Sequence, residues 1–241
     1  MENNRISNRI NNRIIVALDF AERDKALALV KTLDSSQCRV KVGKEMFTRF
    51  GPDLVKDIQS LGFDVFLDLK FHDIPNTVSK AVAAAADLGV WMLTLHAAGG
   101  ADMMRAARAA VEGRENAPLL VAVTVLTSLA EDDLAVQGIA RSAQEQVLRL
   151  ASLAQESGMD GVVCSAAEAG ELRKLLNDSF LLVTPGIRPA GDPADDQKRI
   201  VTPAAAVSAG SNYLVIGRPI TRAREPLEKL HQIQAEISGN L

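Results

Sequence analysis

Eight short apolar segments alternate with helical patterns along almost the whole chain, and this alternation constrains the fold more than any other feature. The apolar segments are rich in β-branched residues, as buried strands are, and they span residues 13–19, 39–43, 64–70, 91–96, 119–126, 161–164, 180–184 and 213–217. Helical patterns lie between them at 23–33, 52–61, 77–88, 101–111, 143–157, 166–176, 203–209 and 225–237. Strands that alternate with helices run parallel and are joined by crossover helices. Eight such units in 241 residues predict a (β/α)8 TIM barrel rather than an open doubly wound sheet.

The barrel is predicted to form a single domain over residues 13–241, because no composition shift or linker divides this part of the chain. Hydrophobic residues make up 47% of the chain, which is enough for one large core. Residues 1–12 are rich in Asn and Arg and contain no apolar segment of the signal-peptide kind. We therefore predict that they form a loosely ordered N-terminal tail.

Charge and cysteine usage exclude several classes of partner. The 27 basic and 30 acidic residues are spread along the chain and leave a net charge of −3. The sequence therefore has no block of basic residues of the kind that binds nucleic acid. No apolar run is long enough to span a bilayer. Cys38 and Cys164 lie far apart, without the spacing of metal ligands, and we interpret them as reduced thiols. These features are typical of a cytoplasmic protein without nucleic-acid or membrane partners.

Polar residues gather at the predicted carboxyl ends of the strands, where barrels of this kind place their catalytic groups. Asp68 and Lys70 end the third strand and share one face of it, because side chains alternate along a strand. A structural ion pair would explain these two residues if they stood alone. Several other strands also end in polar residues, namely Asp19, Lys41, His96, Thr124, Thr127, Ser128, Arg188 and Arg218. Together they predict one site at this end of the barrel.

The loops after the seventh and eighth strands indicate a phosphate site. In such barrels these loops often bind phosphate through backbone N–H groups, a helix N-terminus and a cation. Gly186 and Gly217 would let the backbone approach an anion closely, and Arg218 offers a planar fork for phosphate oxygens. The alternative is that both glycines only serve tight turns.

The alternating charges of Lys41, Asp68, Lys70 and Asp73 indicate the chemistry at the other part of the site. Such groups can keep each other ionised in a water-poor pocket. The carboxylates would repel an anionic group of the substrate, and an ammonium group can deliver a proton. This arrangement suits the loss of a carboxylate followed by protonation of the resulting carbanion.

Six sequence blocks, in order along the chain, resemble one known family. They are Val16-Ala-Leu-Asp19, Lys41-Val-Gly-Lys44, Asp68-Leu-Lys70-Phe-His-Asp73-Ile-Pro-Asn-Thr77, Thr124-Val-Leu-Thr127-Ser128, Thr184-Pro-Gly-Ile-Arg188 and Ile216-Gly-Arg218-Pro. The resemblance is to bacterial orotidine 5′-phosphate decarboxylases, and it covers nearly the whole chain from about residue 13. It implies conversion of orotidine 5′-monophosphate to uridine 5′-monophosphate and CO2 in pyrimidine biosynthesis, without a cofactor or a metal ion.

The resemblance also implies a role for each matching residue. Lys70 would protonate the pyrimidine carbon that loses the carboxylate, with Asp68 against that carboxylate and Lys41 and Asp73 completing a charged tetrad. Asp19 and Lys41 would bind ribose hydroxyls, and Asp73 and Thr77 would also touch the ribose. Ser128 would contact the pyrimidine, with Thr127 close to the substrate. The phosphate end would be held by Arg188, Gln197, Gly217 and Arg218, and Gln197 would also link it to the base.

A homodimer and a lid are further implications of the resemblance. Asp73 and Thr77 would reach into the active site of the neighbouring subunit. The polar segment 188–197 would close over the substrate, so that phosphate binding energy helps to assemble the catalytic state.

Two other functions compete with this one. A related barrel lyase acting on a sugar phosphate, such as a keto-gulonate phosphate decarboxylase or a hexulose phosphate synthase, shares the Asp-x-Lys-x-x-Asp signature but uses Mg²⁺ and has an acidic residue where this chain has Lys41. A lysine at that position disfavours a divalent cation, and Ser128 and Gln197 suit a nucleobase better than an open-chain sugar. A non-catalytic nucleotide-binding module would keep the phosphate loops but lose the tetrad, which is whole in this chain.

Overall fold

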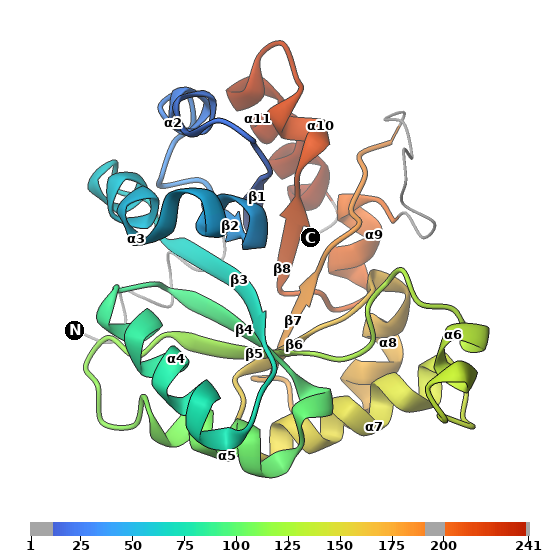
Figure 1. Ribbon diagram of the computed structural model, residues 1–241. Helices are drawn as coiled ribbons and strands as arrows, with labels where there is room; N and C mark the ends of the chain where they lie inside the picture. Colours follow the sequence, from blue (N-terminus) through green and yellow to red (C-terminus); the bar gives the residue numbers. More distant parts are fainter. Residues whose placement is uncertain (1–11, 191–200, 240–241) are drawn as a thin grey trace.

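Eight parallel strands close into a barrel in the computed structural model, which describes residues 12–190 and 201–239 (Figure 1). The strands are β1 (Ile14–Leu18), β2 (Arg39–Gly43), β3 (Val65–Phe71), β4 (Met92–His96), β5 (Leu119–Val123), β6 (Gly161–Val163), β7 (Leu181–Thr184) and β8 (Tyr213–Ile216). Each strand pairs with the next one along the chain, and β1 pairs with β8 to close the barrel. The predicted single-domain (β/α)8 barrel is confirmed.

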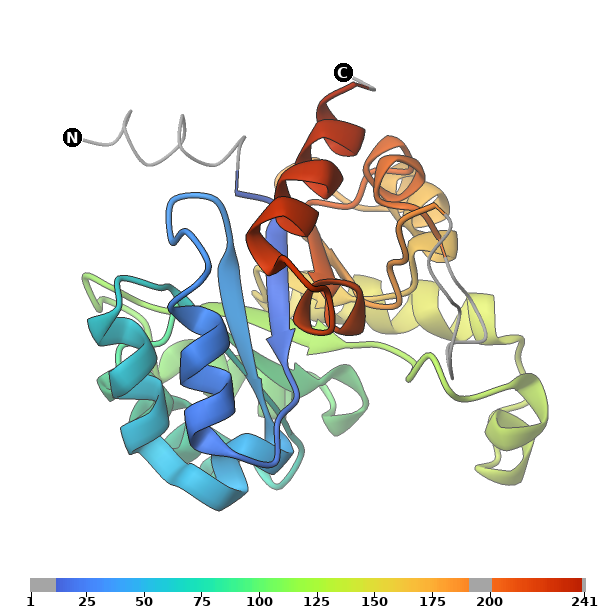
Figure 2. The same cartoon turned by 90° about the horizontal axis from the view of Figure 1, so that it is seen from above.

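Helices surround the barrel on its outside (Figures 1 and 2). They are α2 (Arg23–Val30), α3 (Lys44–Ser60), α4 (Pro75–Asp87), α5 (Ala101–Ala109), α6 (Glu131–Val136), α7 (Ala143–Glu156), α8 (Ala166–Leu175), α9 (Pro203–Ser208), α10 (Arg218–Thr221) and α11 (Pro226–Ser238), with a 3₁₀ turn η1 (Ala97–Gly99). None of the helices in the described ranges combines the length and the apolar character that crossing a bilayer requires.

Three helical segments were not predicted from the sequence. The helix α3 begins at Lys44 rather than at residue 52, and a kink at Gly51, whose φ is 60°, separates its first part from the predicted part. The helices α6 and α10 are only 6 and 4 residues long. Segments of this length contain too few turns for apolar residues to recur with a helical period.

The core has two parts, one on each side of the strands. Along β1, Val16 and Leu18 belong to a large cluster, which also takes in buried residues of the surrounding helices, whereas Ile15 and Ala17 belong to a second, smaller cluster. That second cluster contains inward-facing residues of other strands as well, namely Phe66, Met92, Val121, Val183, Tyr213 and Val215. Since side chains alternate along a strand, the inward positions that follow this apolar layer face the carboxyl end of the barrel. Those positions include the charged residues described below.

A cation–aromatic cluster closes the amino end of the barrel. The guanidinium carbon of Arg39 lies 4.2 Å from the ring centre of Trp91 and 5.6 Å from that of Tyr213. Its Nη1 donates to the backbone carbonyl of Asn12 at 2.6 Å, and its Nε donates to the carboxylate of Asp64 at 3.1 Å. Asn12, which the sequence placed in the tail, is buried and belongs to this end of the barrel. The other residues of the predicted tail, 1–11, lie outside the described residues.

Replacing Arg39 with alanine is expected to lower the free energy of unfolding by about 2–4 kcal/mol, because it removes the cation–aromatic contacts and leaves the buried backbone carbonyl of Asn12 without this donor. Urea unfolding followed by circular dichroism measures this change. The matched control is Arg105→Ala, since among the described residues Arg105 makes an ion pair only with Asp102, an exposed residue on α5, at 3.5 Å. We expect the control to cost less than about 0.5 kcal/mol. Equal effects of the two substitutions would contradict a stabilising role for the cluster.

Candidate active site

A pocket of about 270 Å³ opens at the carboxyl end of the barrel. Charged side chains line it, namely Asp19, Lys41, Asp68, Lys70, Arg188 and Arg218. Apolar residues of the barrel interior form the rest of its wall, among them Ala17, Phe66, Val123, Val163 and Val215. The pocket therefore combines apolar walls with a few convergent charges, as sites for small ligands do.

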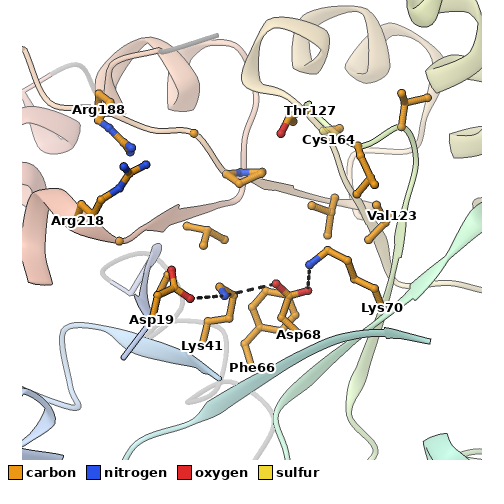
Figure 3. Close-up of a pocket in the computed structure, with 18 residues that line it drawn as sticks. Asp19, Lys41, Phe66, Asp68, Lys70, Val123, Thr127, Cys164, Arg188 and Arg218 are labelled. Carbon is orange, nitrogen blue, oxygen red and sulfur yellow. Dashed lines mark hydrogen bonds and ion pairs between the residues drawn. The ribbon is translucent and has the colours of Figure 1, made fainter. Parts of the chain in front are cut away.

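Four of the charged side chains form a continuous row of alternating sign (Figure 3). The Nζ atom of Lys41 lies 3.7 Å from Oδ1 of Asp19 and 3.5 Å from Oδ2 of Asp68. The other carboxylate oxygen of Asp68, Oδ1, accepts a hydrogen bond of 2.6 Å from Nζ of Lys70. The structure thus brings together residues from β2, β3 and the end of β1, as their positions at strand ends predicted.

The carboxylate of Asp68 is held in its ionised form. Its side chain is only 12% exposed, and burial alone would raise its pKa. The ammonium groups of Lys41 and Lys70, together with hydrogen bonds from Lys70 and Thr94, outweigh burial and keep the pKa of Asp68 below its usual value. Asp68 is therefore a fixed negative charge at neutral pH, inside a pocket with partly apolar walls.

A bulge in β3 sets the position of Lys70. Between the pairs Leu67–Leu93 and Phe71–Leu95, β3 advances four residues while β4 advances two. Within this bulge Lys70 has a φ of 53°, and it is the one residue other than glycine with a positive φ in the described ranges. Its backbone N–H donates to the hydroxyl of Thr94 at 2.8 Å. The backbone at Lys70 is thus strained and is fixed by a side chain of the neighbouring strand.

Two arginines lie at the other end of the pocket. Figure 3 shows the guanidinium groups of Arg188 and Arg218 pointing toward one another, on the opposite side of the pocket from Lys70. Arg188 is 5% exposed, and its backbone N–H donates to the carbonyl of Val201 at 3.0 Å. Gly186, which precedes Arg188 by two residues, has a φ of 78° that favours glycine. This end of the pocket therefore offers two planar cations to an anionic group.

Some residues predicted for the site lie elsewhere in the structure. Thr127 lines the pocket, whereas Ser128 is exposed and does not line it. Asp73 and Thr77 are also exposed and lie outside the pocket of their own chain. The carboxylate of Asp73 accepts the backbone N–H of Ile74 at 2.7 Å. A single chain therefore gathers only three of the four predicted tetrad charges.

One of the residues predicted to hold a phosphate group lies beyond the described part of the chain. Gln197 and the residues 191–196 of the predicted lid lie outside the described residues. Gly217 lines the pocket next to Arg218, as predicted.

Two residues of the site were not identified from the sequence. Thr94 hydrogen-bonds both Asp68 and the backbone of Lys70, and the signal for it was a single polar residue between the apolar residues of β4. Cys164 lines the pocket directly after β6, and its position as the last residue of the predicted strand 161–164 was the only indication. Burial raises the pKa of the Cys164 thiol, so it is protonated at neutral pH. Cys164 therefore contributes to the wall of the pocket rather than to its charge.

His96 ends β4 close to the charged row but adds no charge to it. Burial, together with electrostatic interactions with His72, Lys44 and Lys70, lowers the pKa of His96 to about 4. Its imidazole is therefore neutral at neutral pH. Within the described ranges, no three His, Cys, Asp or Glu side chains are grouped closely enough to hold a metal ion.

The chain is similar to known proteins over nearly its whole length. A family model described as "Orotidine 5'-phosphate decarboxylase / HUMPS family" matches residues 12–233. A curated orotidine 5'-phosphate decarboxylase of Hahella chejuensis is 60% identical over 227 residues, which cover 94% of this chain and 97% of that protein. The Shewanella sediminis protein of the same name is 60% identical over 229 residues, or 95% and 98% of the two chains. The crystal structure of orotidine 5'-phosphate decarboxylase from Lactobacillus acidophilus has a TM-score of 0.84 and 40% identity, covering 93% of this chain and 98% of that one.

Proposed function

Because the chain belongs to the orotidine 5′-phosphate decarboxylase / HUMPS family, we propose that Lys70 delivers the proton that completes the decarboxylation of orotidine 5′-monophosphate. The activity itself is that of relatives about 60% identical over nearly their whole length. The chain is thus a carboxy-lyase that forms uridine 5′-monophosphate and CO2 in pyrimidine biosynthesis. The observation that carries the role of Lys70 is the hydrogen bond of 2.6 Å between its ammonium group and the buried carboxylate of Asp68.

The charged row supports a direct decarboxylation. The substrate carboxylate, placed against Asp68, meets a second negative charge in a pocket with apolar walls, and this repulsion is relieved as CO2 leaves. The bond to the carboxylate breaks and its electron pair stays on the ring carbon. The ammonium group of Lys70 stabilises this negative charge and then transfers its proton to the carbon. The neutral amine that remains regains a proton from solvent after the product leaves.

Lys41 and Asp19 orient this machinery and bind the ribose. Lys41 lies between the carboxylates of Asp19 and Asp68, at 3.7 and 3.5 Å. Its charge keeps both carboxylates in place, and its remaining donors can reach a ribose hydroxyl. This position also disfavours a divalent cation between the two carboxylates. The geometry thus argues against the magnesium-dependent reaction of the related sugar-phosphate lyases.

The two arginines at the far end of the pocket hold the phosphate group of the substrate. Arg188 and Arg218 supply planar donors that match phosphate oxygens. Gly217 allows close approach of the backbone. Binding energy gained here, remote from the reacting carbon, can be used to place the pyrimidine against Asp68 and Lys70. Closure of the segment 188–197, with Gln197 over the substrate, stays a prediction of the sequence.

A homodimer would complete the site. Asp73 and Thr77 are exposed and lie outside the pocket of their own chain, so they are available to a neighbouring one. Between them Ile74 is 65% exposed, and Leu126 at the pocket is 39% exposed. Large apolar side chains on the surface near a site are common where two proteins meet. In the proposed dimer Asp73 of one chain supplies the fourth charge to the pocket of the other, Thr77 contacts ribose there, and Ser128 with Thr127 contacts the pyrimidine.

Loss of orotidine 5′-monophosphate absorbance after addition of the purified protein tests the proposed function. We expect rapid decay that is unchanged by a chelator, because no step uses a metal ion. Decay that depends on added Mg²⁺ would contradict the direct mechanism. Tight binding of uridine 5′-monophosphate without any decay would identify a nucleotide-binding module instead.

A further inference from the structure

Thr94 connects the two residues at the centre of the charged row. It lies in β4, is fully buried, and does not line the pocket. Its Oγ1 donates to Oδ1 of Asp68 at 3.0 Å and accepts the backbone N–H of Lys70 at 2.8 Å. One hydroxyl group therefore bridges the backbone of the predicted proton donor and the carboxylate beside it.

The bulge in β3 explains why Lys70 needs such a partner. Within the bulge the regular pairing with β4 is interrupted, so the N–H of Lys70 cannot join the ladder of backbone hydrogen bonds. A buried N–H without an acceptor costs about 1–3 kcal/mol, and a positive φ outside glycine is unfavourable as well. The hydroxyl of Thr94 supplies the missing acceptor at this position. It thereby stabilises a backbone conformation that the sequence of β3 would not adopt by itself.

The same bond fixes the direction of the hydroxyl proton. A threonine hydroxyl has one proton to donate, and the side of Thr94 Oγ1 that faces Lys70 is occupied by an incoming N–H. Its proton therefore points to Oδ1 of Asp68, the oxygen that also accepts from Nζ of Lys70 at 2.6 Å. The second oxygen, Oδ2, is left facing Lys41 at 3.5 Å. The rotation of the Asp68 carboxylate is thus set from outside the pocket.

We propose that Thr94 is a positioning residue of the decarboxylation, which holds the ammonium group of Lys70 and the carboxylate of Asp68 in their reactive arrangement. The proposal rests on the proposed function, since it concerns the same two groups. Thr94 acts without touching the substrate, because it lies behind Asp68 and outside the pocket lining. Its removal should therefore affect the rate of the chemical step more than the binding of a nucleotide.

Two matched pairs of side chains test the hydroxyl group separately from side-chain size. The first pair is the wild type and Thr94→Val, because valine keeps the shape of threonine without the hydroxyl. The second pair is Thr94→Ser, which keeps the hydroxyl without the methyl group, and Thr94→Ala, which lacks both. In both pairs we expect loss of the hydroxyl to lower kcat by about 10²-fold, as small misplacements of reacting groups do. Thr94→Ser should stay within about fivefold of the wild type.

Binding of uridine 5′-monophosphate, measured by calorimetry, separates positioning from general damage. We expect its Kd to change less than about threefold in every folded variant, because the nucleotide does not touch Thr94. If Thr94→Val does not fold, the comparison of kcat between Thr94→Ser and Thr94→Ala still tests the proposal. The proposal would be overturned if the wild type is active and loss of the hydroxyl changes kcat by less than about fivefold, both from the wild type to Thr94→Val and from Thr94→Ser to Thr94→Ala. An inactive wild type would instead overturn the proposed function.

Discussion

Replacing Lys70 with alanine is expected to lower kcat for orotidine 5′-monophosphate by at least about 10⁴-fold, because the substitution removes both the general acid and the cation beside the developing carbanion. The Nζ atom of Lys70 is the donor closest to Asp68, at 2.6 Å, and Lys41 is farther away at 3.5 Å. Lys41 is also placed between two carboxylates. It therefore cannot take over protonation without leaving that position.

Nucleotide binding distinguishes a lost acid from a lost fold. The Lys70→Ala variant should bind uridine 5′-monophosphate with a Kd within about tenfold of the wild type, since the proposed phosphate contacts are at the other end of the pocket. The matched control is Lys56→Ala, because Lys56 is an exposed lysine on α3 whose one ion pair within the described ranges is with Asp53, at 4.0 Å. The control should retain full activity. If the Lys70→Ala variant keeps more than about 1% of wild-type kcat, a group other than Lys70 donates the proton to the ring carbon.

The barrel could be predicted from the sequence because its signal is local. The strand β2 has the bounds that were predicted, 39–43, and the other strands differ at their ends. Alternation along a strand also placed Asp68 and Lys70 on one face of the third strand, and both line the pocket. Short apolar runs and the polar residues after them can be recognised in the sequence without knowing which distant residues are in contact. The position of the pocket follows from the same two signals.

Features that depend on contacts between strands could not be predicted. The bulge in β3 and the φ of 53° at Lys70 arise from the pairing with β4, which no local pattern of β3 reveals. Thr94 acquires its role only through that pairing, and within its own strand it is one polar residue among apolar ones. Asp73 is a different case, because only the family resemblance, and no local pattern, implied that it acts in the site of a second chain. A motif that reads as one charged tetrad along the sequence is divided in the structure of a single chain.

Mixed dimers of two inactive variants are expected to recover activity if Asp73 acts in the neighbouring site. Lys70→Ala and Asp73→Ala homodimers should each have less than about 1% of wild-type activity, since each site lacks one essential charge. In a heterodimer, the pocket of the Asp73→Ala chain keeps its own Lys70 and receives an intact Asp73 from its partner. The other pocket lacks both. One of the two sites is whole, so the isolated heterodimer should have about half the activity of the wild type.

Coexpression with two affinity tags, followed by purification on both, isolates this heterodimer for the decarboxylation assay. The matched control combines Lys70→Ala with Asp68→Ala. Because Lys70 and Asp68 line the pocket of the same chain, neither site of that heterodimer is whole, and no activity should return. Recovery in the first pair alone would support an active site shared between two chains. A folded Lys70→Ala and Asp73→Ala heterodimer without activity would contradict it, since a carboxylate acting in its own chain cannot be supplied by a partner.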